Sequence, residues 1–253
     1  MLTAGIDSGS RAVKCILWDG TRVVGRALVD SGLDVAAGAR QALDAACAGG
    51  SRPDAICATG YGRAAVPGAD HRVTEITCHA RGLAQVLPQA RSAIEIGGQD
   101  SKVLRLDQRG QVADFAMNDR CAAGTGRFLE VIAGRLGHDP AGFGRLAAGG
   151  AATPISAMCV VFAESEIVGL VAGGTPPADI AAGVIASIAS RVAALAGRLL
   201  ADPVALTGGV GLLPGMAEAL SRATGRNVLT APDPQFTGAL GAALIAAERS
   251  RPR

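Results

Sequence analysis

Three glycine turns, each placed after a run of apolar, strand-forming residues, have the composition of a phosphate-binding site. The first is Asp7-Ser8-Gly9-Ser10, and the second is Glu95-Ile96-Gly97-Gly98-Gln99-Asp100. The third, Thr207-Gly208-Gly209-Val210, suits an adenosine lying against bare backbone. Backbone N–H groups in such turns hold phosphate oxygens, and neighbouring carboxylates bind Mg²⁺ directly or through water. Together the turns predict a site for a nucleoside triphosphate and its metal.

Several side chains in and beside these turns are candidates for the chemistry of that site. Asp7, Glu95 and Asp100 supply carboxylates for the metal, and Lys14 adds a cation within reach of the phosphates. Gln99 can orient an attacking water, as a glutamine does in some nucleotide hydrolases. The alternative is that the turns are ordinary surface hairpins with solvated side chains. No Walker-type or dinucleotide-binding glycine pattern is present.

Two cysteines precede segments with helical periodicity. Cys121 lies shortly before the amphipathic run that starts at Arg127, and Cys159 lies directly before the apolar run 160–168. A helix N-terminus stabilises a thiolate. The chain has no Cys-x-x-Cys pair, so zinc is not favoured. Because a four-iron cluster normally takes four thiolates, two per chain indicate one cluster shared by two chains, whereas the alternative is two inert buried thiols.

The other four cysteines are expected to be structural. Cys15 and Cys57 fall in predicted strands, and Cys47 falls in an alanine-rich predicted helix. Cys78 stands beside His79 in another predicted helix. Both of these side chains can bind metal, but adjacent residues on a helix point in different directions.

An internal repeat supplies the elements that would position these residues. Strands expected at 2–7, 13–18 and 23–29 return at 93–96, 103–106 and 112–117. An offset of 88 positions aligns Asp7 with Glu95, Gly9 with Gly97, Lys14 with Lys102 and Asp19 with Asp107. Further elements are expected at 36–48, 127–134, 175–200 and 238–248 (helices) and at 204–207 (strand). Thr175, followed by two prolines, is expected to cap the longest helix.

Length and composition exclude several classes of protein. The 253 residues suit two modest domains, and a net charge of +2 with 3% aromatic residues disfavours nucleic acid as a partner. No uninterrupted apolar run reaches the roughly 20 residues of a membrane-spanning helix. Asp7 lies too close to Met1 for a signal peptide. We therefore expect a cytoplasmic protein with reduced thiols and no membrane contact.

The motifs, taken in order, resemble the activators (component A) of 2-hydroxyacyl-CoA dehydratases, within the family that also contains the ATP-binding subunits of benzoyl-CoA reductase. The specific part is the pair of cysteine segments, NDRCAAGTGRFL at 118–129 and CVVFAESE at 159–166. The other matching segments are 4–10, 58–63, 96–100, 207–210 and 238–244. These glycine turns are shared with the wider superfamily of actin, sugar kinases and seventy-kilodalton chaperones.

The resemblance implies a duplicated actin-like α/β fold, two lobes with a nucleotide cleft. Residues 1–92 plus 234–253 are expected to form the first lobe, and 93–233 the second, which carries the cluster cysteines. It further implies a homodimer with one [4Fe-4S] cluster held by Cys121 and Cys159 of both chains, and ATP with Mg²⁺ in each subunit. The residues expected to bind the nucleotide are Gly9, Ser10, Arg11, Lys14, Gly97, Gly98, Gly124, Thr125, Gly208 and Gly209.

Activators of this kind take an electron from ferredoxin or flavodoxin and pass it, with ATP consumption, to an iron–sulfur dehydratase or reductase. Glu95 departs from the family pattern, which usually has Asp at this turn, so metal placement there is in question. Alternatives of the same family are a benzoyl-CoA reductase subunit and the activator of a double-cubane cluster reductase. A kinase or a non-redox regulator of the same fold would need no cluster cysteines.

Overall fold

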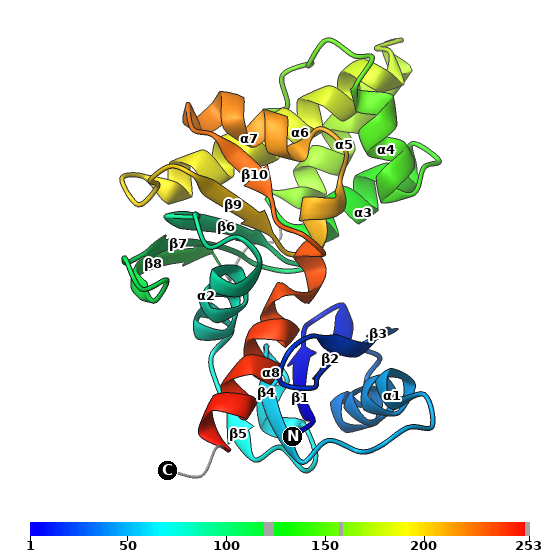
Figure 1. Cartoon of the computed structure of the whole chain (residues 1–253). Helices are drawn as coiled ribbons and strands as arrows, with labels where there is room; N and C mark the ends of the chain where they lie inside the picture. Colours follow the sequence, from blue (N-terminus) through cyan, green and yellow to red (C-terminus); the bar gives the residue numbers. More distant parts are fainter. Residues whose placement is uncertain (119–123, 157–158, 251–253) are drawn as a thin grey trace. The chain divides into compact units, whose positions relative to one another are not determined.

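The chain forms two compact units. The computed structural model describes residues 1–118, 124–156 and 159–250 (Figure 1). Unit 1 consists of Met1–Ala90, Leu106–Ala113 and Ala231–Arg253, and unit 2 of Arg91–Arg105 and Asp114–Thr230. The boundaries expected from the sequence, 1–92 plus 234–253 and 93–233, remain a prediction of how two repeats divide the chain.

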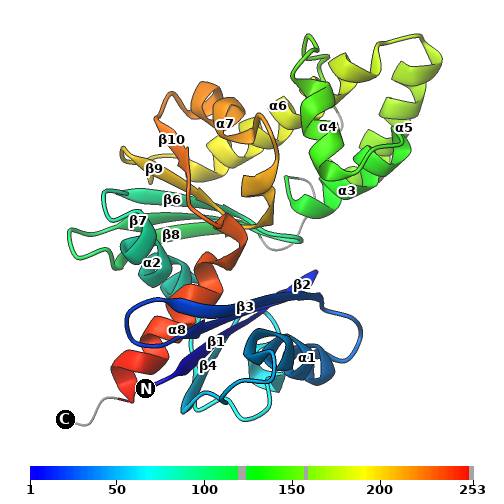
Figure 2. The ribbon, with the colours of Figure 1, turned by 45° about the vertical axis from the view of Figure 1, so that its right-hand side comes forward.

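Unit 1 is built on a five-stranded sheet in the order β3-β2-β1-β4-β5 (Figure 2). β1 runs antiparallel to β2 and parallel to β4. All six residues of β1 are buried, because both of its faces and both of its edges are covered. The strands are β1 (Thr3–Ser8), β2 (Ala12–Trp18), β3 (Val23–Asp30), β4 (Ala55–Thr59) and β5 (His71–Arg72).

Three helices complete unit 1, together with the 3₁₀ turns η1 (Arg63–Ala65) and η3 (Pro234–Phe236). α1 (Val35–Cys47) begins at Asp34, whose carboxylate accepts a hydrogen bond from the Ala37 N–H. α2 (Glu75–Val86) begins at Thr74, whose hydroxyl caps it in the same way. α8 (Thr237–Arg249) is buried along nearly its whole length. Its glycines and alanines allow it to pack closely on both α2 and the sheet, which larger side chains would prevent.

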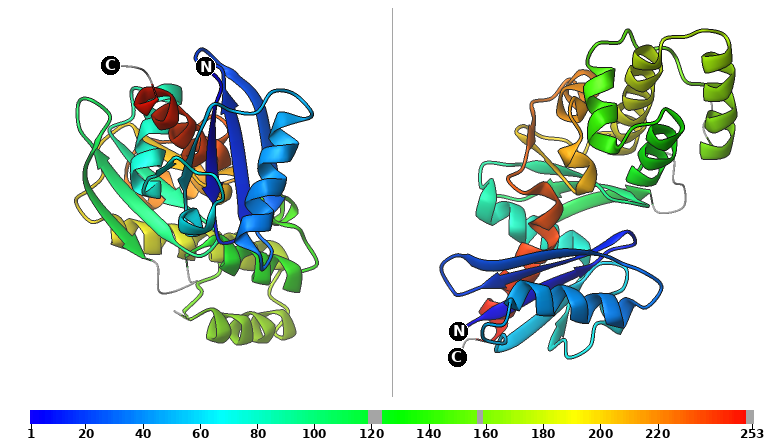
Figure 3. Two further views of the ribbon diagram at one scale, coloured as in Figure 1. Left: turned by 90° about the horizontal axis from the view of Figure 1, so that it is seen from below. Right: turned by 90° about the vertical axis from the view of Figure 1, so that its right-hand side faces the viewer.

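Unit 2 repeats this sheet, in the order β10-β9-β6-β7-β8. Its strands are β6 (Ser92–Ile96), β7 (Ser101–Leu106), β8 (Val112–Asn118), β9 (Val204–Thr207) and β10 (Val228–Thr230). Its helices are α3 (Gly126–Arg135), α4 (Pro140–Ala147), α5 (Val160–Ala172), α6 (Pro177–Ala196) and α7 (Met216–Thr224), with the 3₁₀ turn η2 (Gly209–Leu212). The right-hand view of Figure 3 shows the green to yellow-green helices of unit 2 gathered on one side of its teal strands.

The predicted repeat is present at the level of individual hydrogen bonds. In the first hairpin the Gly9 N–H donates to Ala12 O over 3.2 Å, and in the second Gly97 N–H donates to Asp100 O over 3.0 Å. Asp19 and Asp107, which the offset of 88 aligns, each accept a backbone N–H two residues ahead, from Thr21 and Arg109 respectively. Aspartate side chains favour this local turn. The two sheets therefore share topology, register and turn chemistry.

The longest helix differs from expectation at its start. The cap residue of α6 is Pro176 rather than Thr175, and no side chain caps it. The early acid Asp179 instead accepts a hydrogen bond from the Ala151 N–H over 2.7 Å. Proline has no N–H to satisfy, so the first turn of the helix needs less capping than the sequence pattern suggested.

Among the helices in the described part of the chain, α6 is long and apolar enough to cross a membrane. One side of it, including Ile180, Val184, Ile188 and Val192, is buried in the core of unit 2. Such burial is typical of a core helix.

We predict that Gly241→Ala destabilises the protein by about 1–3 kcal/mol or prevents folding. A methyl group on Gly241 would overlap the backbone carbonyl of Cys78 on α2, which cannot move without moving the helix. The matched control is Gly134→Ala in α3, where a methyl group meets nothing within 4 Å. That change should be neutral or stabilising by up to about 1 kcal/mol. Denaturant unfolding of both variants measures the difference, and equal stabilities would contradict the close helix contact.

Candidate functional site: two acid–lysine pairs beside glycine turns

In unit 1 an acid and a lysine face each other across the first hairpin. Asp7 on β1 and Lys14 on β2 are direct partners in the strand register. The Lys14 Nζ donates to Asp7 Oδ2 over 3.1 Å. Asp7 is buried, and the Lys14 side chain is 17% exposed. The pair holds the carboxylate at the start of the glycine turn.

Unit 2 repeats the pair and adds a second acid. Glu95 on β6 and Lys102 on β7 are again register partners. The Lys102 Nζ donates to Glu95 Oε2 over 2.8 Å and to Asp100 Oδ2 over 2.7 Å. The Lys102 side chain is only 1% exposed. The extra methylene of Glu95 is thus accommodated by an ion pair with the lysine opposite.

A Thr-Gly turn closes over each acid. Thr59 on β4 is the register partner of Asp7, and Thr207 on β9 is that of Glu95. The next residues, Gly60 and Gly208, have φ values of +86° and +88°, which side-chain-bearing residues rarely adopt. A methyl group on Gly60 would lie 2.6 Å from Asp7 Oδ1.

The equivalent methyl group on Gly208 would lie 2.7 Å from Glu95 Oε1. Gly60 was not among the predicted site residues. The sequence does contain a signal for it, because a Thr-Gly pair lies at the end of both β4 and β9, the strands that run parallel to β1 and β6.

The second glycine turn is fastened to the start of α3. The N–H groups of Gly126 and Arg127 each donate over 2.8 Å, to the carbonyls of Gly97 and Gly98. The Ser101 hydroxyl donates to Gly124 O over 2.8 Å. Thr125, the cap residue of α3, is fully buried. The structure therefore brings together four of the predicted nucleotide-binding residues, namely Gly97, Gly98, Gly124 and Thr125.

Other predicted residues of the turns differ in how far they are exposed to solvent. Gln99, Arg11 and Gly209 are exposed, and Ser10 is half-buried. The first turn is held by Ser31, whose hydroxyl donates to Gly9 O over 2.7 Å. An exposed Gln99 next to a buried carboxylate is placed where a side chain can contact a ligand or a water molecule.

Lys14 and Lys102 are the only lysines in the sequence, against 22 arginines. An ammonium group is a compact point charge that fits between two strands, whereas the planar guanidinium needs more room. Lysine is therefore confined to the two positions where a cation must reach a buried carboxylate across a hairpin.

Cys159 is exposed and is the cap residue of α5. This confirms that the residue precedes a helix. Cys121 lies outside the described residues. Within the part of the chain that the structure describes, no group of three or more His, Cys, Asp or Glu side chains could hold a metal ion.

The four remaining cysteines lie in unit 1, where Cys15, Cys57 and Cys78 are buried. Cys47 is half-buried at the end of α1, and burial raises the pKa of the Cys15 thiol to about 12. Cys57 and Cys78 form a thiol pair. The pKa of Cys78 is raised mainly by a hydrogen bond with Cys57 and, to a smaller extent, by burial. The same hydrogen bond lowers the pKa of Cys57.

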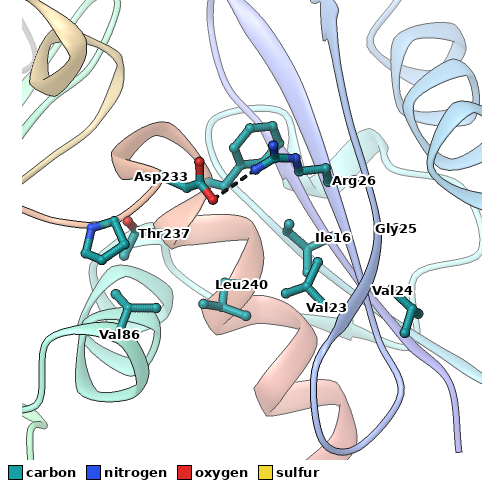
Figure 4. A pocket seen from close by; sticks show the side chains of 11 residues that line it. Ile16, Val23, Val24, Gly25, Arg26, Val86, Asp233, Thr237 and Leu240 are labelled. Atoms are coloured by element: carbon teal, nitrogen blue, oxygen red, sulfur yellow. Dashed lines mark hydrogen bonds and ion pairs between the residues drawn. The ribbon is translucent and has the colours of Figure 1, made fainter.

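A pocket of about 430 Å³ lies elsewhere in unit 1, between β2, β3 and α8 (Figure 4). Its floor is apolar, and Arg26 spans its rim by donating to Asp233 over 2.9 Å. The Arg26 guanidinium also lies 5.7 Å from the centre of the Phe236 ring. None of the predicted site residues lines this pocket.

Comparison with solved structures identifies the fold class. A glucokinase of the ROK family from Streptomyces griseus, solved with glucose and AMPPNP, superposes with a TM-score of 0.58 at 15% identity, covering 98% of this chain and 100% of that one. At this identity the likeness concerns the fold alone, and it confirms the predicted fold of sugar kinases and actin. The duplicated sheets are thus those of an actin-like ATPase fold.

The chain belongs to the BadF/BadG/BcrA/BcrD ATPase family, whose pattern it matches over residues 4–246. It is 44% identical to the activator of lactoyl-CoA dehydratase from Anaerotignum propionicum, over 99% of both chains. The solved activator of 2-hydroxyisocaproyl-CoA dehydratase from Clostridium difficile, with bound ADPNP, superposes with a TM-score of 0.93 at 38% identity, covering 98% of this chain and 95% of that one. The family predicted from the sequence motifs is confirmed.

We predict that the two lysines differ sharply in reactivity toward an amine-acylating reagent. Lys102 is buried and should react on the order of tenfold or more slowly than Lys14, because acylation requires local opening. Adding ATP with Mg²⁺ should slow Lys14 further if its ammonium lies near the phosphates. Peptide mass spectrometry measures both rates. The denatured protein, in which both lysines should react alike, is the control, and equal rates in the native protein would contradict the burial of Lys102.

Proposed function

We propose that this protein is an ATP-dependent activator that delivers a low-potential electron to an iron–sulfur enzyme of the 2-hydroxyacyl-CoA dehydratase type. The observation that carries the proposal is the identity of 44% over 99% of both chains with the activator of lactoyl-CoA dehydratase. The acid–lysine hairpins and the exposed Cys159 ahead of α5 support it.

The nucleotide is proposed to bind at the glycine turns. Their backbone N–H groups suit phosphate oxygens, and the start of α3 adds the positive end of a helix dipole beside Gly97 and Gly98. The donor chemistry also fits Mg²⁺, which prefers carboxylate oxygens and water. In unit 2 two buried carboxylates, Glu95 and Asp100, both bind the ammonium of Lys102, which places two acids beside the second turn.

Hydrolysis then requires a water molecule held close to the terminal phosphate. Gln99 is exposed at the tip of the second turn, and its amide can accept and donate hydrogen bonds at once. Asp7 is held by Lys14 at the first turn, where a carboxylate can bind a metal-coordinated water. We propose that Asp7, Glu95 and Asp100 position the metal and that Gln99 orients the water.

The cysteine chemistry fits one [4Fe-4S] cluster shared by two chains. Cys159 offers an exposed sulfur at the N-terminus of a helix, and Cys121 is proposed as the second ligand of each chain. α5 presents large exposed apolar residues (Val161, Phe162, Val168 and Val171), as expected for a helix covered by a second copy. When bound, such a cluster supplies a one-electron carrier. The electron donor is proposed to be ferredoxin or flavodoxin.

We predict about two irons per chain after anaerobic reconstitution. Cys121→Ser and Cys159→Ser should each abolish iron binding, because a hydroxyl is a poor substitute for a thiolate ligand. The matched control is Cys47→Ser, which changes a half-buried cysteine of unit 1 and should retain iron. Iron and acid-labile sulfide assays with size-exclusion chromatography measure this. A wild-type protein without iron would overturn the electron-transfer proposal and favour a kinase or regulator.

We predict that Asp7→Asn lowers the rate of ATP hydrolysis on the order of 100-fold without loss of iron. The amide keeps the size of the side chain but removes the charge that Lys14 neutralises and that the metal shell uses. The control is Asp19→Asn, a substitution at the half-exposed aspartate of the turn between β2 and β3. Steady-state phosphate release measures both, and equal rates in the two variants would exclude Asp7 from the site.

A further inference from the structure

His79 is a buried ionisable residue that the proposed mechanism does not use. It lies on α2 and is 6% exposed. Its neighbour Cys78 faces Cys57. The two residues therefore do not form a joint metal site.

Glycines bring α2 unusually close to the core of unit 1. A methyl group on Gly82 of α2 would overlap the Thr237 carbonyl of α8, and one on Gly5 of β1 would overlap the Ala239 carbonyl. α2, α8 and β1 are thus in backbone contact at these points, together with Gly241 described above. A side chain on the inner face of α2 can reach the end of β1 only because these glycines remove the intervening atoms.

The imidazole of His79 and the carboxylate of Asp7 both lie close to the position that a side chain on residue 238 would occupy. A methyl group built on Gly238, at the start of α8, would lie 3.0 Å from His79 Nε2 and 3.4 Å from Asp7 Oδ2. A methyl group at this position would contact both side chains. Glycine at position 238 therefore leaves room for the Nε2 edge of His79 and the carboxylate of Asp7 to lie near the same point.

The two oxygens of Asp7 have different surroundings. Oδ1 faces the Gly60 turn, where a methyl group would come within 2.6 Å of it. Oδ2 binds Lys14 Nζ and lies on the side of His79. A short aspartate can rotate about its χ2 torsion, and two groups beside one oxygen restrict that rotation more than one group does.

In unit 2 the corresponding acid is held differently. Glu95 is fixed through Oε2 to a lysine that also binds Asp100. Unit 1 has no carboxylate at the matching position, because residue 12 is Ala12. The polar group that lies near Asp7 from the side of α2 is His79.

Resting on the proposed function of Asp7 in metal binding, we infer that His79 is a positioning residue for Asp7. The imidazole holds Oδ2 from within the core, so that Oδ1 is presented toward the Gly60 turn and the ligand. His79 itself contacts no ligand. This gives the helix α2 a direct part in shaping the metal site.

The experiment compares His79→Leu, His79→Gln and the control His71→Gln, a substitution at the half-exposed histidine of β5, in the iron-loaded protein. For His79→Leu we expect the Mg²⁺ concentration that half-saturates hydrolysis to rise about tenfold, with the KM for ATP at saturating Mg²⁺ within about twofold. Gln carries a nitrogen near the position of Nε2 and should recover most of the loss. The control should resemble wild type.

Two further measurements separate positioning from a merely structural role. The affinity of Mn²⁺·ADP, measured by electron paramagnetic resonance, should fall about tenfold in His79→Leu and does not depend on turnover. In an Asp7→Asn background the same change should have little effect, because its target carboxylate is gone. Unchanged Mn²⁺·ADP affinity in His79→Leu, or an equal loss with and without Asp7, would overturn the inference. A wild-type protein lacking iron would instead count against the proposed function alone.

Discussion

The charge pair across each hairpin is the constraint on which the arrangement of the site depends. A carboxylate buried at the end of a central strand is costly unless an opposite charge reaches it. Antiparallel pairing places the lysine of the second strand directly opposite the acid, at Asp7 with Lys14 and at Glu95 with Lys102. A shift of register by one residue would turn the lysine to the other face of the sheet. Strand register and site electrostatics therefore specify each other.

The glycines follow from the same constraint. Once a carboxylate is held in the sheet, the neighbouring parallel strand turns so close to its second oxygen that a side chain there would collide with it. Gly60 and Gly208 make this turn with positive φ values. The carbonyls of Gly97 and Gly98 accept hydrogen bonds from the first N–H groups of α3. The N-terminus of this helix therefore points toward the second turn. Part of the glycine content is explained by these close approaches and by the contacts among α2, α8 and β1.

Much of the fold could be predicted from the sequence, because alternating apolar residues and short polar turns mark both sets of hairpin strands. The offset of 88 that aligns Asp7 with Glu95 holds only as far as the third strand of each sheet. Beyond it, unit 2 contains α3 to α6, so Thr59-Gly60 and Thr207-Gly208 are separated by a different offset and their equivalence was missed. His79 was considered only as a metal ligand together with Cys78. Its position near Asp7 could not be foreseen, because a lone histidine in a helix carries no signal about which strand it packs against. Thr175 was wrongly expected to cap α6, since capping residues are often displaced by one position.

The family could not have been inferred from spacing alone. Cys121 and Cys159 have no regular separation. Their number and their places before helices suggested a shared cluster, but only the likeness of the surrounding segments indicated the family. What the fold adds is the exposure of Cys159 at a helix start and the apolar outer face of α5.

The path of the chain affects the order in which the two units can fold during translation. The core of unit 1 includes Ala239, Ala242 and Ala243 of α8, which is translated after all of unit 2. During synthesis the first 90 residues therefore lack the helix that fills one face of their sheet. Unit 2, which is nearly continuous in sequence, can complete its own core first. Domains generally fold as units as they emerge from the ribosome, so this N-terminal unit is the one that waits for the end of translation.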